Sequence, residues 1–499
     1  MPTLTATDSY KLSHRTLMDP RTEFIYSNLT PRSAKYLPVD KSTFDNKAVF
    51  FGLQHFIKDY LIREWNEEFF SQPRDKVIAQ FKRRCDTFLG KDALSMGHFE
   101  QLHDLGYLPL SIKALPEGAR VNLRVPFFTI TNTHPAFAWL TNYLETVISC
   151  EIWKPCTTAT IGFELRRLIS RYAMETVGHL GGTQFQIHGF ECRGMSGRHD
   201  AAISGAGPLL SFWGTDTLMA VDLLERSYNA DAEKELIACS VPASEHSVSS
   251  LGTALVGELE FFRKAITQDY PTGIVSLVSD TYDFFRVVTE YATALKEDIL
   301  ARRPNALGLA KVVFRPDSGD QIKIVCGDPK APADSPEGKG AVECLWDIFG
   351  GTVSPAGYRM LHERVGLIYG DGCSPSVIHG ILEGLKAKRF ASNNCVFGVG
   401  SYTYGCRSRD DLGMAVKATW AQVAGVGYDI YKDPKTDDGL KKSARGLLRV
   451  DKVGNDYVLK DECTREEEQG GELREVYRDG KLLYETSLSE MRARIDAAF

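Results

Sequence analysis

The chain has 499 residues, 43% of them hydrophobic and 25% charged, which is typical of a soluble globular protein with two domains or with one large barrel and additions. A net charge of −6 and the lack of any run of about 18 apolar residues argue against nucleic acid or a membrane as a partner. The first residues do not form a signal peptide, and the eleven scattered cysteines include no C-x-x-C pair, so we expect free thiols and a cytoplasmic location.

The first 150 residues or so combine strand and helix signals. Residues 24–28 alternate like a strand, residues 49–61 place aromatic side chains at helical spacing, and residues 105–130 are typical of strands joined by turns. We therefore expect a mixed α/β region here.

From about residue 150 the pattern changes to strand, polar residues and helix, repeated several times. We expect a helix over residues 160–176 and strands, in chain order, at 184–190, 236–241, 274–278, 312–314, 365–369 and 394–397. Alternation of this kind predicts a parallel sheet or barrel with crossover helices. The rhythm is lost in the last hundred residues, and residues 432–446 are strongly charged.

The stretch Val312–Asp320 is an example of a strand that is followed by charged residues and a glycine. Three apolar residues form a short buried strand, and Arg315, Asp317 and Gly319 follow it. In parallel α/β folds this rim is where sites are found. Arg315 offers a planar fork for a phosphate or a carbonyl oxygen, and Asp317 can hold a sugar hydroxyl or a metal-bound phosphate. A salt-bridged turn is the simpler alternative for this stretch alone.

Polar groups also follow the other strands, which favours one shared site. They are Arg193, Asp216, His246, Asp280, Arg315 with Asp317, Asp371, and the glycines Gly398 and Gly400. Each has an ordinary structural explanation: Asp216 and Asp280 could cap helices, and His246 could be a buried histidine with satisfied hydrogen bonds. Seven such explanations at seven successive strand ends are less plausible than one site.

The loop Gly398-Val-Gly400 follows a late strand, and late strand-to-helix loops of barrels often bind phosphate through backbone N–H groups. Arg409 lies a few residues on. Other phosphate and metal motifs fail, because residues 205–210 lack the third small residue of a dinucleotide fingerprint and neither a P-loop nor an H-E-x-x-H helix occurs.

Several short blocks resemble the nicotinamide phosphoribosyltransferase family. They are DSYK (8–11), FFGLQ (50–54), GTDT (214–217), SVPASEHS (240–247), VSDTYD (278–283), FRPDSGD (314–320), GDG (370–372) and KDP (432–434), so the resemblance covers most of the chain. It implies a type II phosphoribosyltransferase with an irregular α/β barrel over residues 151–404 that carries the active site. It also implies a second α/β domain, built from residues 1–150 and C-terminal segments of about 405–499, and a homodimer with shared active sites.

The reaction that this resemblance implies joins nicotinamide to phosphoribosyl pyrophosphate (PRPP), giving nicotinamide mononucleotide and pyrophosphate in NAD salvage. Mg²⁺ is implied as a cofactor. ATP is implied as a co-substrate, whose hydrolysis through a phosphorylated histidine improves the reaction without being strictly required.

The resemblance also assigns roles position by position. The phosphorylated histidine falls on His246 and its orienting carboxylate on Asp280, while Asp317 is the third catalytic residue and the link to Mg²⁺ through PRPP. The implied pyridine-binding residues are Phe190, Tyr10 from the other subunit, Asp216, Ser276 and Arg315, and the implied phosphoribosyl- and phosphate-binding residues are Arg193, Gly370, Asp371, Gly400, Ser401, Arg409 and Lys432. Ser401 stands where the family commonly has a glycine, and Cys192 where a tyrosine often precedes the arginine.

Three other functions compete with this interpretation. A nicotinate phosphoribosyltransferase would differ only in the ring pocket. A barrel aldolase or isomerase acting on sugar phosphates would need a Schiff-base lysine on an apolar strand, and Lys311, at the beginning of its strand, is the only candidate. A non-catalytic binding protein would leave the charged strand ends unexplained.

Overall fold

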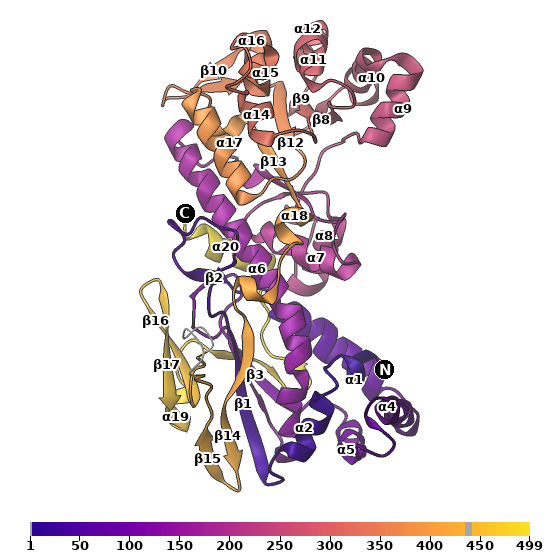
Figure 1. Cartoon of the computed structure of the whole chain (residues 1–499), viewed down its shortest axis with the longest axis vertical. Helices are drawn as coiled ribbons and strands as arrows, with labels where there is room; N and C mark the ends of the chain where they lie inside the picture. Colours follow the sequence, from indigo (N-terminus) through magenta and orange to yellow (C-terminus); the bar gives the residue numbers. More distant parts are fainter. Residues whose placement is uncertain (1, 435–441) are drawn as a thin grey trace.

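The computed structural model describes residues 2–434 and 442–499; residues 435–441, within the C-terminal segments expected to join the N-terminal domain, lie outside the described residues. The molecule is elongated, with one sheet in the lower half and another in the upper half of Figure 1. The long helix α6 (Trp139–Thr176) passes from one half to the other, and the expected boundary near residue 150 falls within it. The domain limits stay a prediction.

The lower sheet is antiparallel and is built from both ends of the chain. Its strands, in spatial order, are β15 (Val426–Asp429), β14 (Ala415–Val423), β1 (Thr22–Thr30), β5 (Phe128–Asn132), β3 (Leu110–Ala114), β18 (Arg474–Arg478) and β19 (Lys481–Leu482). β1 pairs with β14 along its whole length, so a strand near the N-terminus and one near residue 420 lie side by side. Beside this sheet lie the helices α2 (Lys11–Leu17), α4 (Arg74–Leu89) and α5 (Gly97–Leu105) (Figure 1).

The upper sheet is parallel throughout and curls into a barrel. Its strands, in spatial order, are β7 (Gly214–Thr215), β6 (Ile187–Phe190), β13 (Val396–Gly400), β12 (Val365–Tyr369), β9 (Ala310–Arg315) and β8 (Gly273–Val278). Two single bridges close the ring, because Cys239 pairs with Gly214 of β7 and Ala243 pairs with Ser276 of β8. The predicted fold class, an irregular α/β barrel with a second α/β part, is confirmed.

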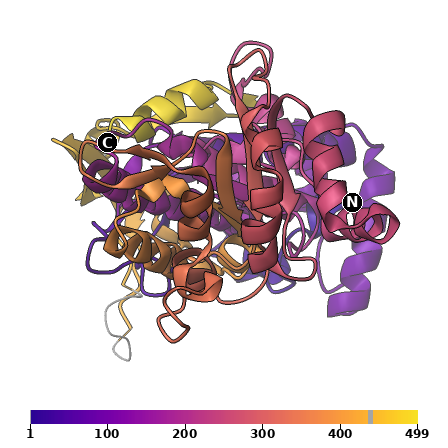
Figure 2. The same cartoon turned by 90° about the horizontal axis from the view of Figure 1, so that it is seen from above.

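Helices stand around the strands of the upper half in the view from above (Figure 2). They are α7 (Arg198–Ala206), α8 (Leu218–Tyr228), α9 (His246–Val256), α10 (Glu258–Lys264), α14 (Gln321–Cys326), α16 (Ala341–Phe349), α17 (Pro375–Ala387) and α18 (Ser401–Tyr404). Because the strands are parallel, all their carboxyl ends meet at one rim. Val278 lies opposite Arg315 there, and Phe190 lies opposite Gly400.

Besides 3₁₀- and π-helical segments such as Ile57–Glu64, the described chain contains further helices and strand pairs. They are helices α1 (Pro2–Thr5), α3 (Leu53–Phe56), α11 (Phe284–Arg286), α12 (Ala292–Ala294), α13 (Lys296–Leu300), α15 (Pro336–Lys339) and α19 (Arg465–Glu468), and the strand pairs β2 (Lys47–Val49) with β4 (Arg120–Asn122), β10 (Gly351–Val353) with β11 (Arg359–Leu361), and β16 (Leu447–Val453) with β17 (Asp456–Cys463). Among the described residues, no helix is long and apolar enough to cross a membrane.

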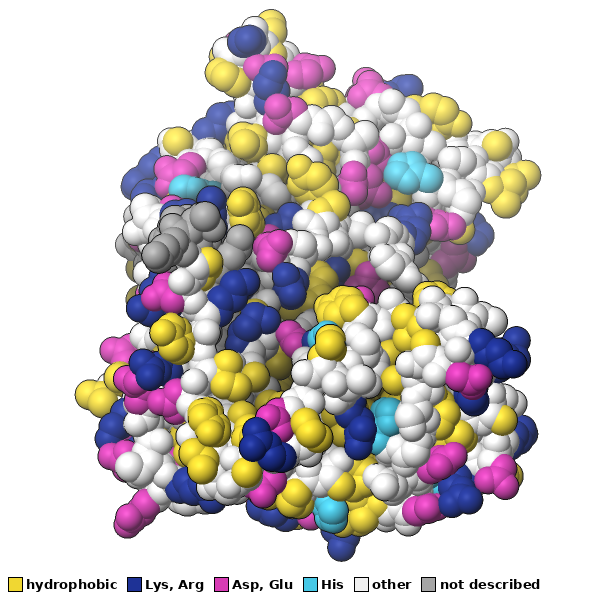
Figure 3. Space-filling model, turned by 60° about the horizontal axis from the view of Figure 1, so that its bottom comes forward, with side chains coloured by type: hydrophobic (Ala, Val, Ile, Leu, Met, Phe, Trp, Pro, Cys, Tyr) yellow, Lys and Arg dark blue, Asp and Glu magenta, His cyan; other side chains and the backbone are white. Residues whose placement is uncertain are grey.

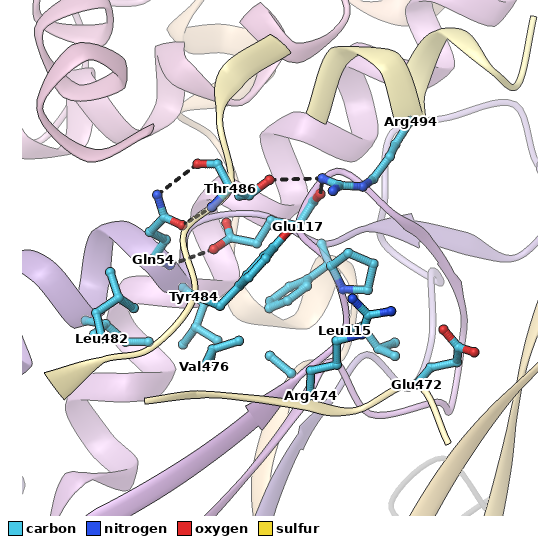
Figure 4. Close-up of a pocket in the computed structure, with 15 residues that line it drawn as sticks. Gln54, Leu115, Glu117, Glu472, Arg474, Val476, Leu482, Tyr484, Thr486 and Arg494 are labelled. Carbon is cyan, nitrogen blue, oxygen red and sulfur yellow. Dashed lines mark hydrogen bonds between the residues drawn. The ribbon is translucent and has the colours of Figure 1, made fainter. Parts of the chain in front are cut away.

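The C-terminal end of the chain is fastened to the N-terminal region through buried hydrogen bonds (Figure 4). Gln54 exchanges two of them with the backbone of Thr486, and Arg494, on the last helix α20 (Leu488–Asp496), donates to the carbonyl of Glu117. A cavity of about 230 Å³ with an apolar lining lies beside these contacts, and none of the predicted site residues lines it.

Two elements differ from the expectation at the upper sheet. The predicted strand at 236–241 is reduced to the single bridge at Cys239, with Pro242 following. The glycines of the expected phosphate loop lie inside β13, where the absence of a side chain is needed. A Cβ at Gly398 would lie 2.5 Å from the ring of Phe190, and one at Gly400 would lie 2.9 Å from the carbonyl oxygen of Phe190.

Candidate active site

A histidine–carboxylate pair occupies the rim beyond β8. His246 is the first residue of α9, and its Nε2 lies 3.1 Å from Oδ1 of Asp280, whose side chain is only 4% exposed. The other oxygen of Asp280 accepts hydrogen bonds from the backbone N–H of Asp317 and the hydroxyl of Ser318, at 3.0 and 2.6 Å. Asp280 is thereby fixed as an acceptor, and this arrangement directs the proton to Nε2 of His246 and leaves Nδ1 open for chemistry.

A second carboxylate, Asp317, lies on the open side of that histidine. Its Oδ2 is 4.0 Å from His246 Nδ1, and its Oδ1 is 3.4 Å from Arg315 Nε. Burial raises the pKa of Asp317; the positive charge of Arg315 opposes this rise and the nearby carboxylates Asp280 and Asp371 add to it. The rim thus holds a cluster of negative charge with one arginine inside it.

Gly370 makes the close packing of this cluster possible. A Cβ at that position would lie 1.9 Å from Oδ1 of Asp317, so any side chain there would displace the carboxylate. Gly370 also donates its N–H to the carbonyl of Pro316 at 3.1 Å, which joins the turn after β12 to the turn after β9. The predicted residues Gly370 and Asp371 therefore lie beside Asp317, as the strand order requires.

The ends of β6 and β7 bring aromatic rings and a carboxylate together, and this group of residues is called the ring pocket below. The ring of Phe190 packs on Gly398, and His188, two residues earlier on the same face of β6, lies 5.0 Å from Phe190 between ring centres. Nε2 of His188 is 2.8 Å from Oδ1 of Asp216, and the hydroxyl of Ser240 also donates to that oxygen. An aromatic face next to a fixed acceptor can bind a planar ring that carries an N–H donor.

Asp216 remains ionised in this pocket. Burial acts to raise its pKa, but the hydrogen bonds from His188 and Ser240 and the positive charge of Arg315 outweigh burial, and the net pKa is lowered. Its carboxylate does not cap α8, which begins after Thr217 without a side-chain cap. The capping explanation is thus not what the structure shows for Asp216, nor for Asp280, whose oxygens are taken by His246, Asp317 and Ser318.

Two loops meet on the far side of the pocket. The loop that carries Arg193 follows β6, and Ser401 follows β13; a Cβ at Gly194 would lie 2.3 Å from the hydroxyl oxygen of Ser401. Arg193 is exposed, and the backbone of Gly400 and Ser401 leads into α18. Ser276, by contrast, is a buried residue of β8 whose backbone bonds to residues 242 and 244.

Three predicted residues lie away from the barrel rim. Tyr10 immediately precedes α2 and is 58% exposed, and Arg409 is close enough to act on its pKa, which burial and Asp8 raise. Lys432 is exposed beyond β15, where its backbone pairs with Ser443. Figure 1 places α2 and β15 in the lower half, so one chain does not bring these residues to His246.

Several groups that contact the site residues were not predicted from the sequence. His188 could have been found, because it alternates with Phe190 on one strand and so shares its face. Glu191, fully buried behind the pocket, accepts a hydrogen bond from Thr217, and burial raises its pKa to about 7. Ser240 lies in the expected strand at 236–241 and begins the block 240–247 that carries the resemblance, but no role was assigned to it.

A metal ion would find oxygen ligands here only together with a substrate. No group of three or more His, Cys, Asp or Glu side chains in the described ranges is arranged to hold an ion. Oδ1 of Asp317 is buried and makes no hydrogen bond, and Asp371 is exposed nearby. One or two carboxylates completed by phosphate oxygens is how proteins usually bind Mg²⁺, so these residues fit that ion.

Lys311, the only Schiff-base candidate, lies at the beginning of β9, whereas the charged cluster follows the end of that strand. Figure 3 shows Lys and Arg side chains gathered at mid-height on one face, so local positive charge exists despite the net negative charge.

The histidine–carboxylate cluster and the residues of the ring pocket meet at the carboxyl-end rim of a parallel barrel, which is where barrel enzymes carry their active sites. The model of the nicotinate phosphoribosyltransferase (NAPRTase) family matches residues 185–481. The chain belongs to this family.

Similar proteins extend over nearly the whole chain. A nicotinamide phosphoribosyltransferase of Acinetobacter baylyi is 54% identical over 492 residues, which are 99% of this chain and 96% of that protein. A protein of the same name from Mycoplasma pneumoniae is 33% identical over 87% of this chain and 92% of its own length. This chain and these relatives therefore match over most of the length of both proteins.

Two solved structures share the fold. The nicotinate-nucleotide pyrophosphorylase of Pyrococcus furiosus superimposes with a TM-score of 0.58 at 14% identity, over 99% of this chain and 95% of that one. The human nicotinic acid phosphoribosyltransferase gives a TM-score of 0.55 at 14% identity, over 99% and 93%. At this identity they support the architecture alone.

Proposed function

We propose that this protein is a nicotinamide phosphoribosyltransferase, a pentosyltransferase that joins nicotinamide to PRPP and releases nicotinamide mononucleotide and pyrophosphate in NAD salvage. The relatives of that name over nearly the full length support the reaction class. The observation that carries the choice of pyridine is Asp216, an ionised acceptor fixed by His188 beside the ring of Phe190.

The ring pocket discriminates by hydrogen-bond chemistry. Nicotinamide presents an amide with two N–H donors, while nicotinate presents a carboxylate with none. Asp216 accepts from the amide and repels the acid, and Phe190 offers the face on which the ring stacks. Stacking holds the ring nitrogen in line with the sugar carbon, which raises the rate of a weak nucleophile.

The charge that develops in the reaction is matched at both ends of the breaking bond. In this proposal Asp317 and Asp371, which lie close together, face the positive charge that grows on the ribose, and Arg193 and the backbone N–H groups of residues 400–401 bind the pyrophosphate, on which negative charge grows. Mg²⁺, held by Asp317 and the substrate, would supply further positive charge to the leaving group.

In this proposal His246 accepts the γ-phosphoryl group of ATP. Nδ1 attacks the γ-phosphorus, the bond to the β-phosphate oxygen breaks and ADP leaves, while Nε2 keeps its proton against Asp280. His246 also begins an α-helix of eleven residues, whose N-terminus favours the added negative charge.

A homodimer would complete the site. Tyr10 directly precedes α2 and Lys432 follows β15, and both elements lie in the lower half of Figure 1; a second copy could bring its own lower half to the rim. A reducing, cytoplasmic setting agrees with the eleven cysteines, all of which are free thiols.

The test is a direct product analysis. Protein, PRPP and Mg²⁺ are mixed with nicotinamide or with nicotinate, with and without ATP, and the products are identified by mass spectrometry. We expect nicotinamide mononucleotide as the main product and a higher yield with ATP. A product from nicotinate alone would establish the rival nicotinate phosphoribosyltransferase instead, and no product from either pyridine would overturn the reaction class.

A further inference from the structure

A buried lysine that the mechanism above does not use lies beneath the loop that carries Arg193 and the chain around Ser401, which are called the two phosphate loops below. Lys154 projects from α6, and its side chain is only 6% exposed. Its ammonium group is 3.4 Å from Oδ1 of Asp200 and 3.3 Å from the carbonyl oxygen of Gly405. A buried charge is costly unless it is paired, so these two contacts account for its presence.

Each contact leads to a different loop. Asp200, in the first turn of α7, accepts the backbone N–H of Ser196 at 2.9 Å, which fixes the end of the loop that carries Arg193. Gly405 directly follows α18, and its N–H donates to the carbonyl of Ser401 at 2.6 Å. Lys154 therefore bonds to the base of the Arg193 loop and to the base of the Ser401 loop at once.

The two loops also touch each other above the lysine. A Cβ at Gly194 would lie 2.3 Å from the hydroxyl oxygen of Ser401, and one at Gly405 would lie 3.1 Å from the sulfur of Met195. The two loops are therefore in close contact, and a small shift of either backbone would change the distance between them. Neighbouring contacts from α6 strengthen the support, since Glu151, one turn before Lys154, bonds to His199 at 2.7 Å.

We propose that Lys154 is a positioning residue for PRPP: through Asp200 and Gly405 it sets the distance between the Arg193 loop and the Ser401 backbone, so that both close on one phosphate group. This inference rests on the proposed function, because it assumes that these loops hold the phosphates. Lys154 does not contact the pyridine pocket, so its effect falls on PRPP and pyrophosphate rather than on nicotinamide.

The test compares Lys154→Met, which replaces the aliphatic part of the side chain and removes the ammonium group, with Lys154→Arg and Asp200→Asn. Steady-state kinetics give KM for PRPP and for nicotinamide separately. We expect Lys154→Met and Asp200→Asn to raise KM for PRPP at least tenfold while KM for nicotinamide changes less than threefold, and Lys154→Arg to recover most of the loss. A merely structural role would lower the melting temperature without this split.

A matched control is Lys113→Met. Lys113 forms a half-buried pair with Glu468 at the lower sheet, far along the chain from either loop, so its loss should affect stability but not KM for PRPP. An unchanged KM for PRPP in Lys154→Met, or arginine as poor as methionine, would overturn the proposal. If Lys154→Met does not fold, the test rests on Asp200→Asn, and an unchanged KM for PRPP in that variant would also overturn the proposal.

The inference can be separated from the proposed function by binding of inorganic pyrophosphate, measured by calorimetry on the wild type and on Asp200→Asn. Weaker pyrophosphate binding in the variant supports the positioning role even where the wild type forms no nicotinamide product. Equal binding overturns it even where that product is formed.

Discussion

Nε2 of His188 lies 2.8 Å from Oδ1 of Asp216; His188 is a residue of β6, and Asp216 directly follows the neighbouring parallel strand β7. The contact holds the Asp216 carboxylate at the side of the pocket and, with Ser240 and Arg315, keeps its pKa low although burial acts to raise it. The pocket therefore presents a fixed negative charge to whatever ring lies on Phe190.

Asp216→Asn should lower the preference for nicotinamide over nicotinate, measured as the ratio of kcat/KM, by at least tenfold. Two like charges about 4 Å apart at an effective dielectric near 20 repel by roughly 4 kcal/mol, or about a thousandfold, less what Arg315 offsets by attracting the acid. Asp222→Asn, an exposed change on α8, is the matched control. An unchanged ratio in Asp216→Asn would remove the reason for choosing the amide.

Incubation with ATP labelled at the γ-phosphate should give a protein label that is labile in acid and stable in base, as expected for a phosphohistidine. His246→Ala should abolish it because, among the described residues, no other histidine is paired with Asp280. His188→Ala serves as the control, since that histidine faces Asp216 instead. Label surviving in His246→Ala would refute the assignment.

Tyr10→Ala should weaken nicotinamide binding although Tyr10 lies far from His246 within one chain (Figure 1). Mixing Tyr10→Ala with His246→Ala under conditions of subunit exchange should restore activity. Half of the dimers would be mixed, with one intact site of two, so about a quarter of the wild-type activity is expected. Mixed dimers that gain no activity would count against a shared site.

The strands of the barrel could be predicted closely because their signals are local. The expected strand at residues 365–369 is β12 (Val365–Tyr369), and the helix that follows it, α17, begins at Pro375 after the capping hydroxyl of Ser374. The polar residues after each strand could be placed at one rim because parallel strands point the same way. That reasoning brought His246, Asp280 and Asp317 together correctly.

Features that depend on packing could not be predicted from local patterns. Pro155 favours a break, yet α6, which is 38 residues long in all, continues through it, and residues on both sides of it, such as Ile152 and Thr158, are fully buried. Burial of this face outweighs the loss of one helical hydrogen bond. The pair of Lys154 with Asp200 joins residues far apart in sequence, and no spacing rule connects them.

Glu191 should make the stability of the protein depend on pH. Burial raises its pKa from about 4.5 to about 7 in the folded state, so the folded protein binds its proton more tightly than the unfolded chain does. Its contribution to stability is therefore complete below about pH 4.5 and is lost as the pH rises to about 7. The gap in pKa corresponds to roughly 3 kcal/mol of unfolding free energy.

The measurement is the free energy of unfolding from pH 4.5 to 8 for the wild type and for Glu191→Gln, which has no titrating group but can still accept the hydrogen bond from Thr217. Burial also raises the pKa of Glu164 to about 7, so the wild type alone would not identify the residue, whereas the difference between the two proteins isolates Glu191. We expect the variant to gain stability relative to the wild type as the pH rises through this range, because only the wild type must then carry a buried carboxylate. Parallel curves for the two proteins would show that Glu191 titrates near its ordinary value.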